Sequence, residues 1–429
     1  MKTLAQLREE INKCVKCGTC RSICPTFRVI GRESASARGK LALIQSYAAG
    51  ELPMSETYVR HIKECTLCGA CMDNCPNGVD TIGIITAARA DAVERQGMPY
   101  AASFIMKTLL DPGRLMPMAL KFASRIQGLL LKDSSVENGL LSRFSLPVIG
   151  GGRLLPPLAR QFFLDTPEAK ALFEDAEKRP GPQGGAKTVR VAFYAGCGVN
   201  YLMPEVGAKS LDVLRRAGVE LVVPSAQTCC GMPAFSMGDV PTARAMALKN
   251  LEAFEAAGFD YITTSCATCG HALKHLFRGL LGDDPELRPR VEAFSAKVRD
   301  ITELLVNALG FVGKGKETDI SGKTVTYHDP CHLNRAQGIR REPRELISNA
   351  KGVAFKEMRF PCGCCGLGGG LSTTNYELSM EITRRKAEGV RDAGADVVVT
   401  ACPGCIVQLR DGLHRYGVDA KVAHVVDLL

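Results

Sequence analysis

The cysteines constrain this chain more than any other feature, because seventeen of the nineteen lie within four residues of another cysteine. Disulfide partners are spread along a chain, whereas metal ligands stand only a few residues apart in short loops. The grouping therefore predicts metal sites in a reducing compartment. The first residues, MKTLAQLREE, lack the apolar segment of a secretory signal, so we expect a cytoplasmic protein.

Two copies of one motif contain the first eight cysteines, CVKCGTCRSICP at 14–25 and CTLCGACMDNCP at 65–76. Both have the C-x2-C-x2-C-x3-C-P spacing of bacterial ferredoxins, in which three cysteines hold one [4Fe-4S] cluster and the fourth reaches the other cluster. Structural zinc is the alternative, but zinc sites usually pair two separate C-x2-C knuckles. We therefore expect one cluster on Cys14, Cys17, Cys20 and Cys75, and a second on Cys65, Cys68, Cys71 and Cys24.

The second half of the chain is predicted to be a duplicated α/β domain. Helix-like stretches at 241–258 and 376–394 recur at nearly the same offset as the cysteines, which indicates that a whole unit is repeated. Cys197, Cys229 and Cys266 recur 134 to 136 residues later as Cys331, Cys364 and Cys402. Apolar runs that predict strands stand at 189–195, 221–224, 325–328 and 397–401.

Each copy of the repeat carries five cysteines. The first cysteine and the C-x2-C pair follow predicted strands, whose carboxyl ends meet at one edge of a parallel sheet, so we expect five thiolates near one point. Five thiolates exceed the four of a cubane or a zinc tetrahedron, which leaves a larger or noncubane cluster, or a four-ligand site with a spare thiol. The sets are Cys197, Cys229, Cys230, Cys266 and Cys269, and Cys331, Cys364, Cys365, Cys402 and Cys405. Cys362 belongs to neither set, and it is either a spare thiol or an alternate ligand.

The patterns C-x31-CC-x35-C-x2-C and C-x32-CC-x36-C-x2-C resemble the CCG domain. That domain is known from heterodisulfide reductase, the glycolate oxidase iron-sulfur subunit, and related lactate-oxidising and anaerobic glycerol-3-phosphate dehydrogenase subunits. A double ferredoxin motif, a connector and two CCG domains in this order resemble the glycolate oxidase iron-sulfur subunit over nearly the whole chain. The resemblance implies one or two further [4Fe-4S] clusters in the CCG domains, of a kind that can be noncubane in that family.

The resemblance also implies a function. The chain would be the electron-transfer subunit of a flavin-linked glycolate or D-lactate dehydrogenase complex, passing electrons from a separate FAD subunit to a quinone or another carrier. The alternative is a catalytic reductase that splits a disulfide at noncubane clusters, as in heterodisulfide reductase. The sequence shows no flavin, nicotinamide or Ser-His-Asp constellation, so we expect substrate oxidation on a partner and no catalytic residue here.

The expected fold class combines α+β and α/β parts. We expect a double [4Fe-4S] ferredoxin-like domain at 1–98, a helical connector at 99–187, and CCG domains at 188–320 and 321–429. Between 99 and 165 the connector has eight basic and four acidic residues, and 116–131 has apolar residues at helical spacing. This stretch could lie on an anionic membrane surface, although packing on the α/β half or a partner is favoured.

Other patterns carry weaker predictions. No apolar run is long enough to cross a membrane, and a net charge of +9 without a recognisable binding motif argues against nucleic acid. His328, Asp329 and His332 flank Cys331 and could relay protons or bind metal, but we favour a role in orienting the loop. His271 and His275 are expected on a helix face. The glycine run at 366–370 is interpreted as backbone flexibility around a cluster, since it lacks a dinucleotide-binding context.

Overall fold

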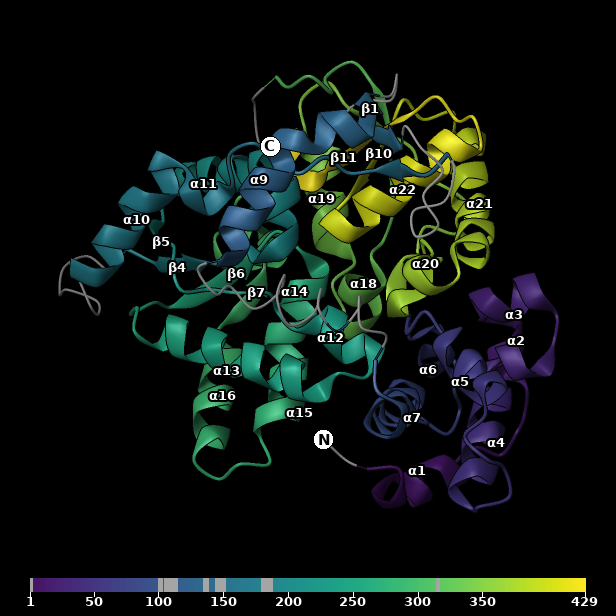
Figure 1. Ribbon diagram of the computed structural model, residues 1–429. Helices are drawn as coiled ribbons and strands as arrows, with labels where there is room; N and C mark the ends of the chain where they lie inside the picture. Colours follow the sequence, from purple (N-terminus) through teal and green to yellow (C-terminus); the bar gives the residue numbers. More distant parts are fainter. Residues whose placement is uncertain are drawn as a thin grey trace.

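The computed structural model describes residues 3–98, 103, 115–133, 139–142, 152–178, 188–313 and 317–429. Figure 1 shows a helical N-terminal part that lies against two α/β units. The predicted fold class, a ferredoxin-like helical domain followed by two α/β domains, is thereby confirmed. Within the described residues, no helix is long and apolar enough to span a membrane.

Short helices separated by the two cysteine loops form the N-terminal part, which has a hydrophobic core of its own. The helix expected at 36–49 is α4 (Ala37–Ala48), which begins where the Ser36 hydroxyl accepts a hydrogen bond from the Gly39 amide at 3.1 Å. The other elements are η1 (Ala5–Leu7), α1 (Arg8–Asn12), α2 (Thr19–Ile23), α3 (Pro25–Ile30), η2 (Glu33–Ala35), α5 (Glu56–Lys63), α6 (Ala70–Asp73) and α7 (Thr81–Gln96).

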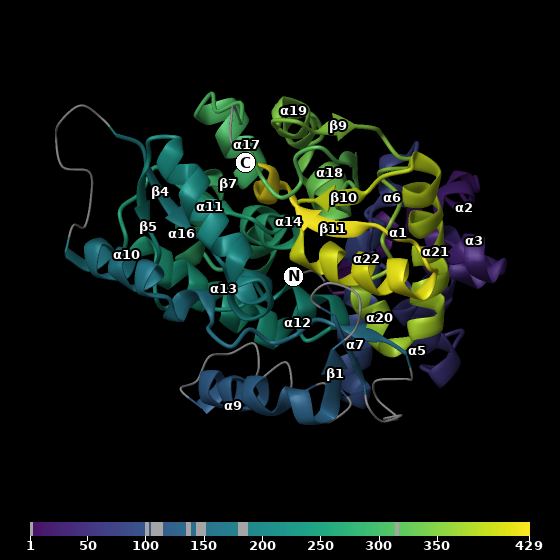
Figure 2. The same cartoon turned by 90° about the horizontal axis from the view of Figure 1, so that it is seen from above.

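The connector contains strands as well as helices, whereas the sequence predicted helices alone. The helix predicted at 116–131 is α9 (Leu115–Leu130), at the periphery of the molecule in Figure 2. A small antiparallel sheet follows, whose strands are too short to leave an alternating pattern in the sequence. Most of the proline- and glycine-rich boundary at 178–187 lies outside the described residues. The remaining elements are β1 (Leu131–Asp133), β2 (Leu140–Ser142), β3 (Leu154–Leu155), η4 (Phe163–Asp165) and α10 (Pro167–Lys178).

The first α/β unit is a four-stranded parallel sheet in the order β5-β4-β6-β7. Strand β4 is buried along its whole length because helices cover both faces, as is usual for parallel sheets. Its strands are β4 (Arg190–Phe193), β5 (Glu220–Val222), β6 (Tyr261–Thr264) and β7 (Val298–Asp300). Its helices are η5 (Gly198–Leu202), α11 (Pro204–Arg216), α12 (Met232–Met237), α13 (Val240–Glu255), α14 (Ala267–His271), η6 (Ala272–Leu276), α15 (Phe277–Leu281), α16 (Leu287–Ala296), α17 (Ile301–Glu303) and η7 (Leu304–Ala308).

The second unit repeats this topology with the order β9-β8-β10-β11, which supports the predicted duplication. The buried residues of both units form one hydrophobic core. The boundary expected near residue 320 therefore separates the two repeats in the sequence, but the repeats share their core. The strands are β8 (Thr324–Tyr327), β9 (Ala354–Phe355), β10 (Val397–Thr400) and β11 (Lys421–His424). The helices are α18 (Cys331–Gln337), α19 (Arg341–Asn349), η8 (Gly368–Gly370), α20 (Leu371–Thr374), α21 (Tyr376–Ala393), α22 (Pro403–Arg415) and η9 (Val425–Leu428).

Arg89 on α7 joins all three parts. Its side chain is 1% exposed. Within the N-terminal part, the guanidinium donates to the carbonyls of Ile62, Lys63 and Cys65 at 2.7–3.1 Å. It also donates to the carbonyl of Ser236 in the first unit at 2.6 Å and to that of Gly369 in the second at 2.9 Å. One buried cation therefore fixes the N-terminal part to both α/β units.

We predict that Arg89→Met lowers the free energy of unfolding by about 3 kcal/mol or more, because buried carbonyls lose a charged donor. Urea unfolding measures this loss, and hydrogen exchange should rise around residues 62–65, 236 and 369. Arg95→Met removes an exposed pair with Asp91 and should cost no more than about 0.5 kcal/mol. Equal stability of the two variants would contradict the role given to Arg89.

Candidate metal centres

The N-terminal cysteines gather around two adjacent cavities. Cys71 lies between the cavities and lines both. The structure thus brings together the two sets expected from the crossover rule, and their assignment as ligands stays a prediction. The first cavity is lined by Cys14, Cys17, Cys20, Cys71 and Cys75, and the second by Cys24, Cys65, Cys68 and Cys71.

Both cysteine loops have the same unusual backbone. Lys16 and Leu67 stand two residues after the first cysteine of their motifs, and both have positive φ, at 57° and 53°. Such angles are strained in residues with a side chain, and they persist where the surrounding structure or a function demands them. Gly18 and Gly69 follow with φ of 88° and 74°. These turns wrap each loop around its cavity, which is what a ligand loop for a compact cluster requires.

The CCG cysteines stand past the carboxyl ends of the strands, as predicted. Cys197 follows β4 and Cys331 follows β8, while Cys266 and Cys402 follow β6 and β10. In the first unit, the sulfurs of Cys197 and Cys229 are 3.8 Å apart.

The second unit repeats this spacing, because the sulfurs of Cys365 and Cys405 are 3.7 Å apart. Two sulfurs bound at about 2.3 Å to one tetrahedral metal are about 3.8 Å apart. Both sites therefore have a sulfur spacing that suits metal ligation.

The two CCG sites are contiguous with each other. The thiols of Cys266 and Cys402 interact electrostatically across the boundary between the units. Thr268 Oγ1 lies 3.5 Å from the Cys402 sulfur, and the Ala267 amide donates to the Ala401 carbonyl at 3.1 Å. Nothing in the sequence indicated this contact, because it depends on how the two repeats pack.

A second contact joins the N-terminal part to the second CCG site. Cys68 and Cys364 line one cavity, and the Cys364 thiol raises the pKa of the Cys68 thiol. Arg335 of α18 donates to the carbonyls of Cys68 at 3.4 Å and Cys362 at 2.6 Å, and pairs with Asp73 at 3.4 Å. The cysteine groups thus form one continuous series, from the two N-terminal sites through the second CCG site to the first.

The glycine run makes this approach possible. A Cβ atom on Gly368 would lie 2.4 Å from the Thr66 carbonyl oxygen, and one on Gly369 would lie 2.2 Å from that of Cys65. Both distances are too short for any side chain, so the run is required for backbone contact between the second unit and the N-terminal part. The interpretation as flexibility around a cluster missed this packing role.

Three buried cations surround the series. Lys40 lines the second N-terminal cavity and donates to the Ala35 carbonyl at 2.5 Å. Lys386 donates to the carbonyls of Phe360 and Pro361 at 2.6 Å, and burial lowers the pKa of Lys386 to about 8. In the described part of the chain, Lys40, Lys386 and Arg89 form no ion pair with a carboxylate.

Burying a cation without a counter-ion is costly, so these sites fit an anionic group. Burial also raises the pKa of the Cys331 thiol, so metal ligation there must release a proton. The donor set and its surroundings therefore fit thiolate-bound clusters that carry net negative charge.

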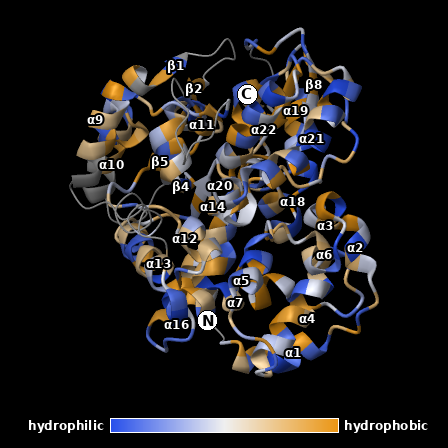
Figure 3. Cartoon of the chain, turned by 45° about the vertical axis from the view of Figure 1, so that its right-hand side comes forward, coloured by the Kyte–Doolittle hydropathy of each residue, from blue (hydrophilic) through white to orange (hydrophobic). Residues whose placement is uncertain are grey.

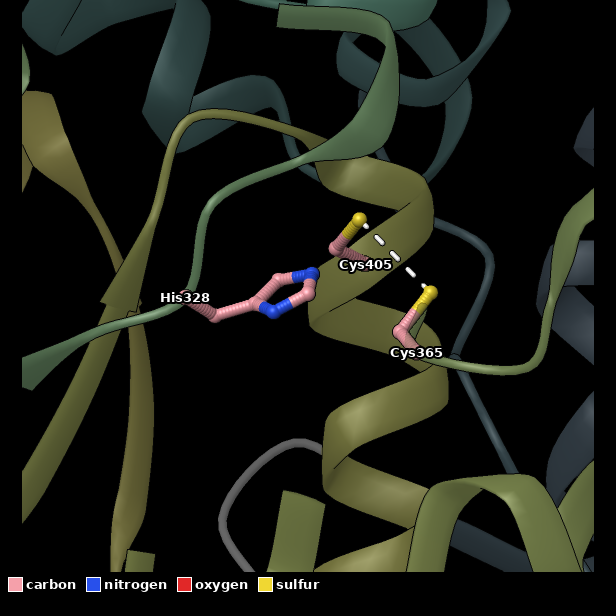
Figure 4. Close-up of side chains that lie close together, drawn as sticks. All are labelled: His328, Cys365 and Cys405. Atoms are coloured by element: carbon pink, nitrogen blue, oxygen red, sulfur yellow. Dashed lines mark hydrogen bonds between the residues drawn. The ribbon is translucent and has the colours of Figure 1, made fainter. Parts of the chain in front are cut away.

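The polar residues near Cys331 have different roles. Asp329 forms a two-pronged ion pair with Arg344 at 2.9 and 2.7 Å, which fixes the loop. His332 Nδ1 lies 3.0 Å from Thr268 Oγ1, and its ring stacks on His271 at a centroid distance of 5.0 Å. His271 thus contacts the second unit, beyond the helix-face role expected for it and for His275. His328 lies beside Cys365 and Cys405 (Figure 4), and Cys362 is exposed.

Comparison with known protein families agrees with this layout. The cysteine-rich CCG domain matches residues 191–274 and 325–410, and the 4Fe-4S dicluster domain matches residues 10–79. A probable glycolate oxidase iron-sulfur subunit of Bacillus subtilis is 32% identical over 98% of this chain and 93% of its own length. The chain belongs to the CCG-domain iron-sulfur oxidoreductase family.

Two further relatives show the breadth of this CCG-domain family. A component of the fumarate reductase (CoM/CoB) of Methanothermobacter marburgensis is 30% identical over 98% of this chain and 72% of its own length. Lactate utilization protein A of Bacillus cytotoxicus is 33% identical over 56% of this chain and 98% of its own length. Among solved structures, a hypothetical protein from Helicobacter pylori covers 97% of this chain and 70% of its own, with 11% identity and a TM-score of 0.49, too weak to show a shared fold.

We predict that Lys40→Met lowers the midpoint potential of the cluster expected near Cys65. A unit charge about 8 Å away at an effective dielectric constant of about 20 is worth about 2 kcal/mol, or about 90 mV for one electron. Redox titration followed by electron paramagnetic resonance measures the shift. The control is Lys209→Met, which removes an exposed pair with Asp427 and should leave the potential unchanged. An unshifted potential in Lys40→Met would refute the charge role of Lys40.

The cysteine assignment has its own test. Cys75→Ala should reduce the bound iron by between one and about four atoms, because either the iron that loses its thiolate or the whole cluster is no longer held. Iron and acid-labile sulfide analysis measures the loss. Cys362→Ala is the matched control and should retain full iron content. Retention in Cys75→Ala, or loss in Cys362→Ala, would show that the ligands are assigned wrongly.

Proposed function

We propose that this chain conducts electrons through a series of iron-sulfur clusters in a flavin-linked 2-hydroxy-acid dehydrogenase complex. The observation that carries the proposal is the series of adjacent cysteine groups. Cys68 and Cys364 line one cavity, and Thr268 of the first CCG site lies 3.5 Å from the sulfur of Cys402 in the second. A protein that only stored metal or used it for stability would have no need to place its sites in contact. A chain of adjacent redox centres does need that placement.

We propose the following ligands. The two N-terminal [4Fe-4S] clusters would be held by Cys14, Cys17, Cys20 and Cys75, and by Cys65, Cys68, Cys71 and Cys24. The CCG clusters would be held by Cys197, Cys229, Cys230, Cys266 and Cys269, and by Cys331, Cys364, Cys365, Cys402 and Cys405. When bound, each cluster supplies one-electron transfer at a potential set by its charge, burial and hydrogen bonds.

The residues around the series do the positioning. Arg335 holds the Cys68 and Cys362 loops together, and Thr268 contacts the sulfur of Cys402. Lys40 and Lys386 supply positive charge inside the protein, which favours addition of an electron nearby. In this proposal no residue of the chain acts on the organic substrate, and a separate FAD subunit removes the hydride.

Helix α9 offers a surface for that partner. Met118, Phe122, Arg125 and Leu129 are exposed at the three- to four-residue spacing of one helix face. Figure 3 shows the helix at the edge of the molecule, with apolar residues along it. Lys121 already pairs with Asp165 at 2.8 Å, which leaves less positive charge for lipid headgroups, so we favour a partner subunit over peripheral membrane contact.

A second function follows from the resemblance of the CCG domains to heterodisulfide reductase. In that alternative, the CCG sites would themselves split a disulfide, and the contact between Cys266 and Cys402 would lie at the reaction site. It would require a disulfide substrate to reach cysteines that are buried in this structure. The conduit proposal has no such requirement.

The predicted outcome of anaerobic purification from the native host is recovery of an FAD-containing subunit together with glycolate- or D-lactate-dependent dye reduction. The α9 variant Met118→Ser/Phe122→Ser/Leu129→Ser should lose the partner and keep its iron. Disulfide-reducing activity without hydroxy-acid activity would move catalysis to the CCG sites and overturn the conduit proposal. Recovery of a cytochrome b without any flavoprotein would also overturn it.

A further inference from the structure

One buried histidine distinguishes the second CCG site. A ring nitrogen of His328 and the sulfurs of Cys365 and Cys405 lie within 4.8 Å of one another. Figure 4 shows the imidazole facing both sulfurs, with the histidine at the end of a strand and Cys405 on a helix. The two sulfurs are 3.7 Å apart, the separation of two thiolates on one tetrahedral metal.

The ring of His328 is held there without hydrogen bonds. The side chain is 1% exposed, and neither ring nitrogen has a partner among the described residues. Its backbone amide donates to the Val399 carbonyl at 2.9 Å, so the main chain is fixed beside β10. A buried imidazole with both nitrogens unpaired is costly, and a ligand in the space that it faces would remove part of that cost.

A buried imidazole is most stable in its neutral form. That form has a free lone pair, which can bind metal.

The first CCG site has no such nitrogen at this position. Tyr194 stands three residues before Cys197, as His328 stands three residues before Cys331. Its hydroxyl donates to the Thr228 carbonyl at 2.5 Å, so its polar group is already satisfied. The two repeats therefore differ at this position, within otherwise parallel cysteine sets.

We propose that His328 is a nitrogen ligand to iron in the second CCG site, beside Cys365 and Cys405. The inference rests on the proposed function, in which this site holds a cluster. Iron-sulfur centres accept imidazole ligands. The second CCG site would then have an imidazole beside its five cysteines, whereas the first would have five cysteines alone, so the two sites would be unequal steps for an electron.

The test compares the loaded full chain with His328→Phe and His328→Cys. Pulsed electron paramagnetic resonance should detect a nitrogen coupling that changes on labelling with 15N-histidine and disappears in both variants. Mössbauer spectroscopy of protein loaded with 57Fe should show that one iron of the second CCG site differs between each variant and the unsubstituted chain. This method detects the iron whatever the spin state of the cluster. In His275→Gln, the control at an exposed histidine, both signals should match the unsubstituted chain.

The outcomes separate the two proposals. A Mössbauer spectrum that is unchanged in His328→Phe at full iron content would overturn the ligand role and leave the conduit intact. His328→Phe could lose iron from the second CCG site. In that case His328→Cys should retain the iron, because a thiolate can replace the imidazole as a ligand. Equal loss of iron in both variants would show that His328 has only a packing role. Absence of iron from that site in the unsubstituted chain would instead refute its occupancy, and with it the proposed series.

Discussion

The proximity of Cys68 and Cys364 depends on close packing of the second CCG unit against the N-terminal part. Several other features of the fold stabilise this packing. The backbone at Gly368 and Gly369 touches the carbonyls of Thr66 and Cys65, where no side chain could fit. Arg89 then binds carbonyls from all three parts, and Arg335 ties the Cys68 and Cys362 loops together. These interactions use backbone carbonyls as acceptors, so the interface is specified by main-chain geometry.

Charge is the second constraint. In the part of the chain that the structure describes, Lys40, Arg89 and Lys386 are buried and form no ion pair with a carboxylate, which costs free energy unless another negative group lies near. Thiolate-bound clusters are such groups, and each of the three cations lies beside a cysteine site. The same charges that make the buried cations tolerable would make the clusters easier to reduce, so stability and redox function are linked through the same residues.

The sequence predicted most of the local structure and little of the assembly. Cysteine spacing indicated both N-terminal groups, and apolar runs located β4, β5, β8 and β10 to within a few residues, because these signals depend on near neighbours in the chain. The small sheet β1-β2-β3 was missed because its strands are too short. The contacts Cys68–Cys364 and Cys266–Cys402 could not be predicted, since they arise only when the parts pack. The positive φ of Lys16 and Leu67 is equally invisible in the sequence.

In the proposed function, electrons pass between the N-terminal and CCG sites within one molecule. Flash reduction of the anaerobic, fully loaded chain, with time-resolved spectra of the N-terminal and CCG centres, tests it directly. We predict that an electron introduced at the N-terminal sites reaches the CCG sites in a first-order step whose rate constant does not change with protein concentration. A transfer rate proportional to protein concentration, or no transfer at all, would contradict the series of joined sites.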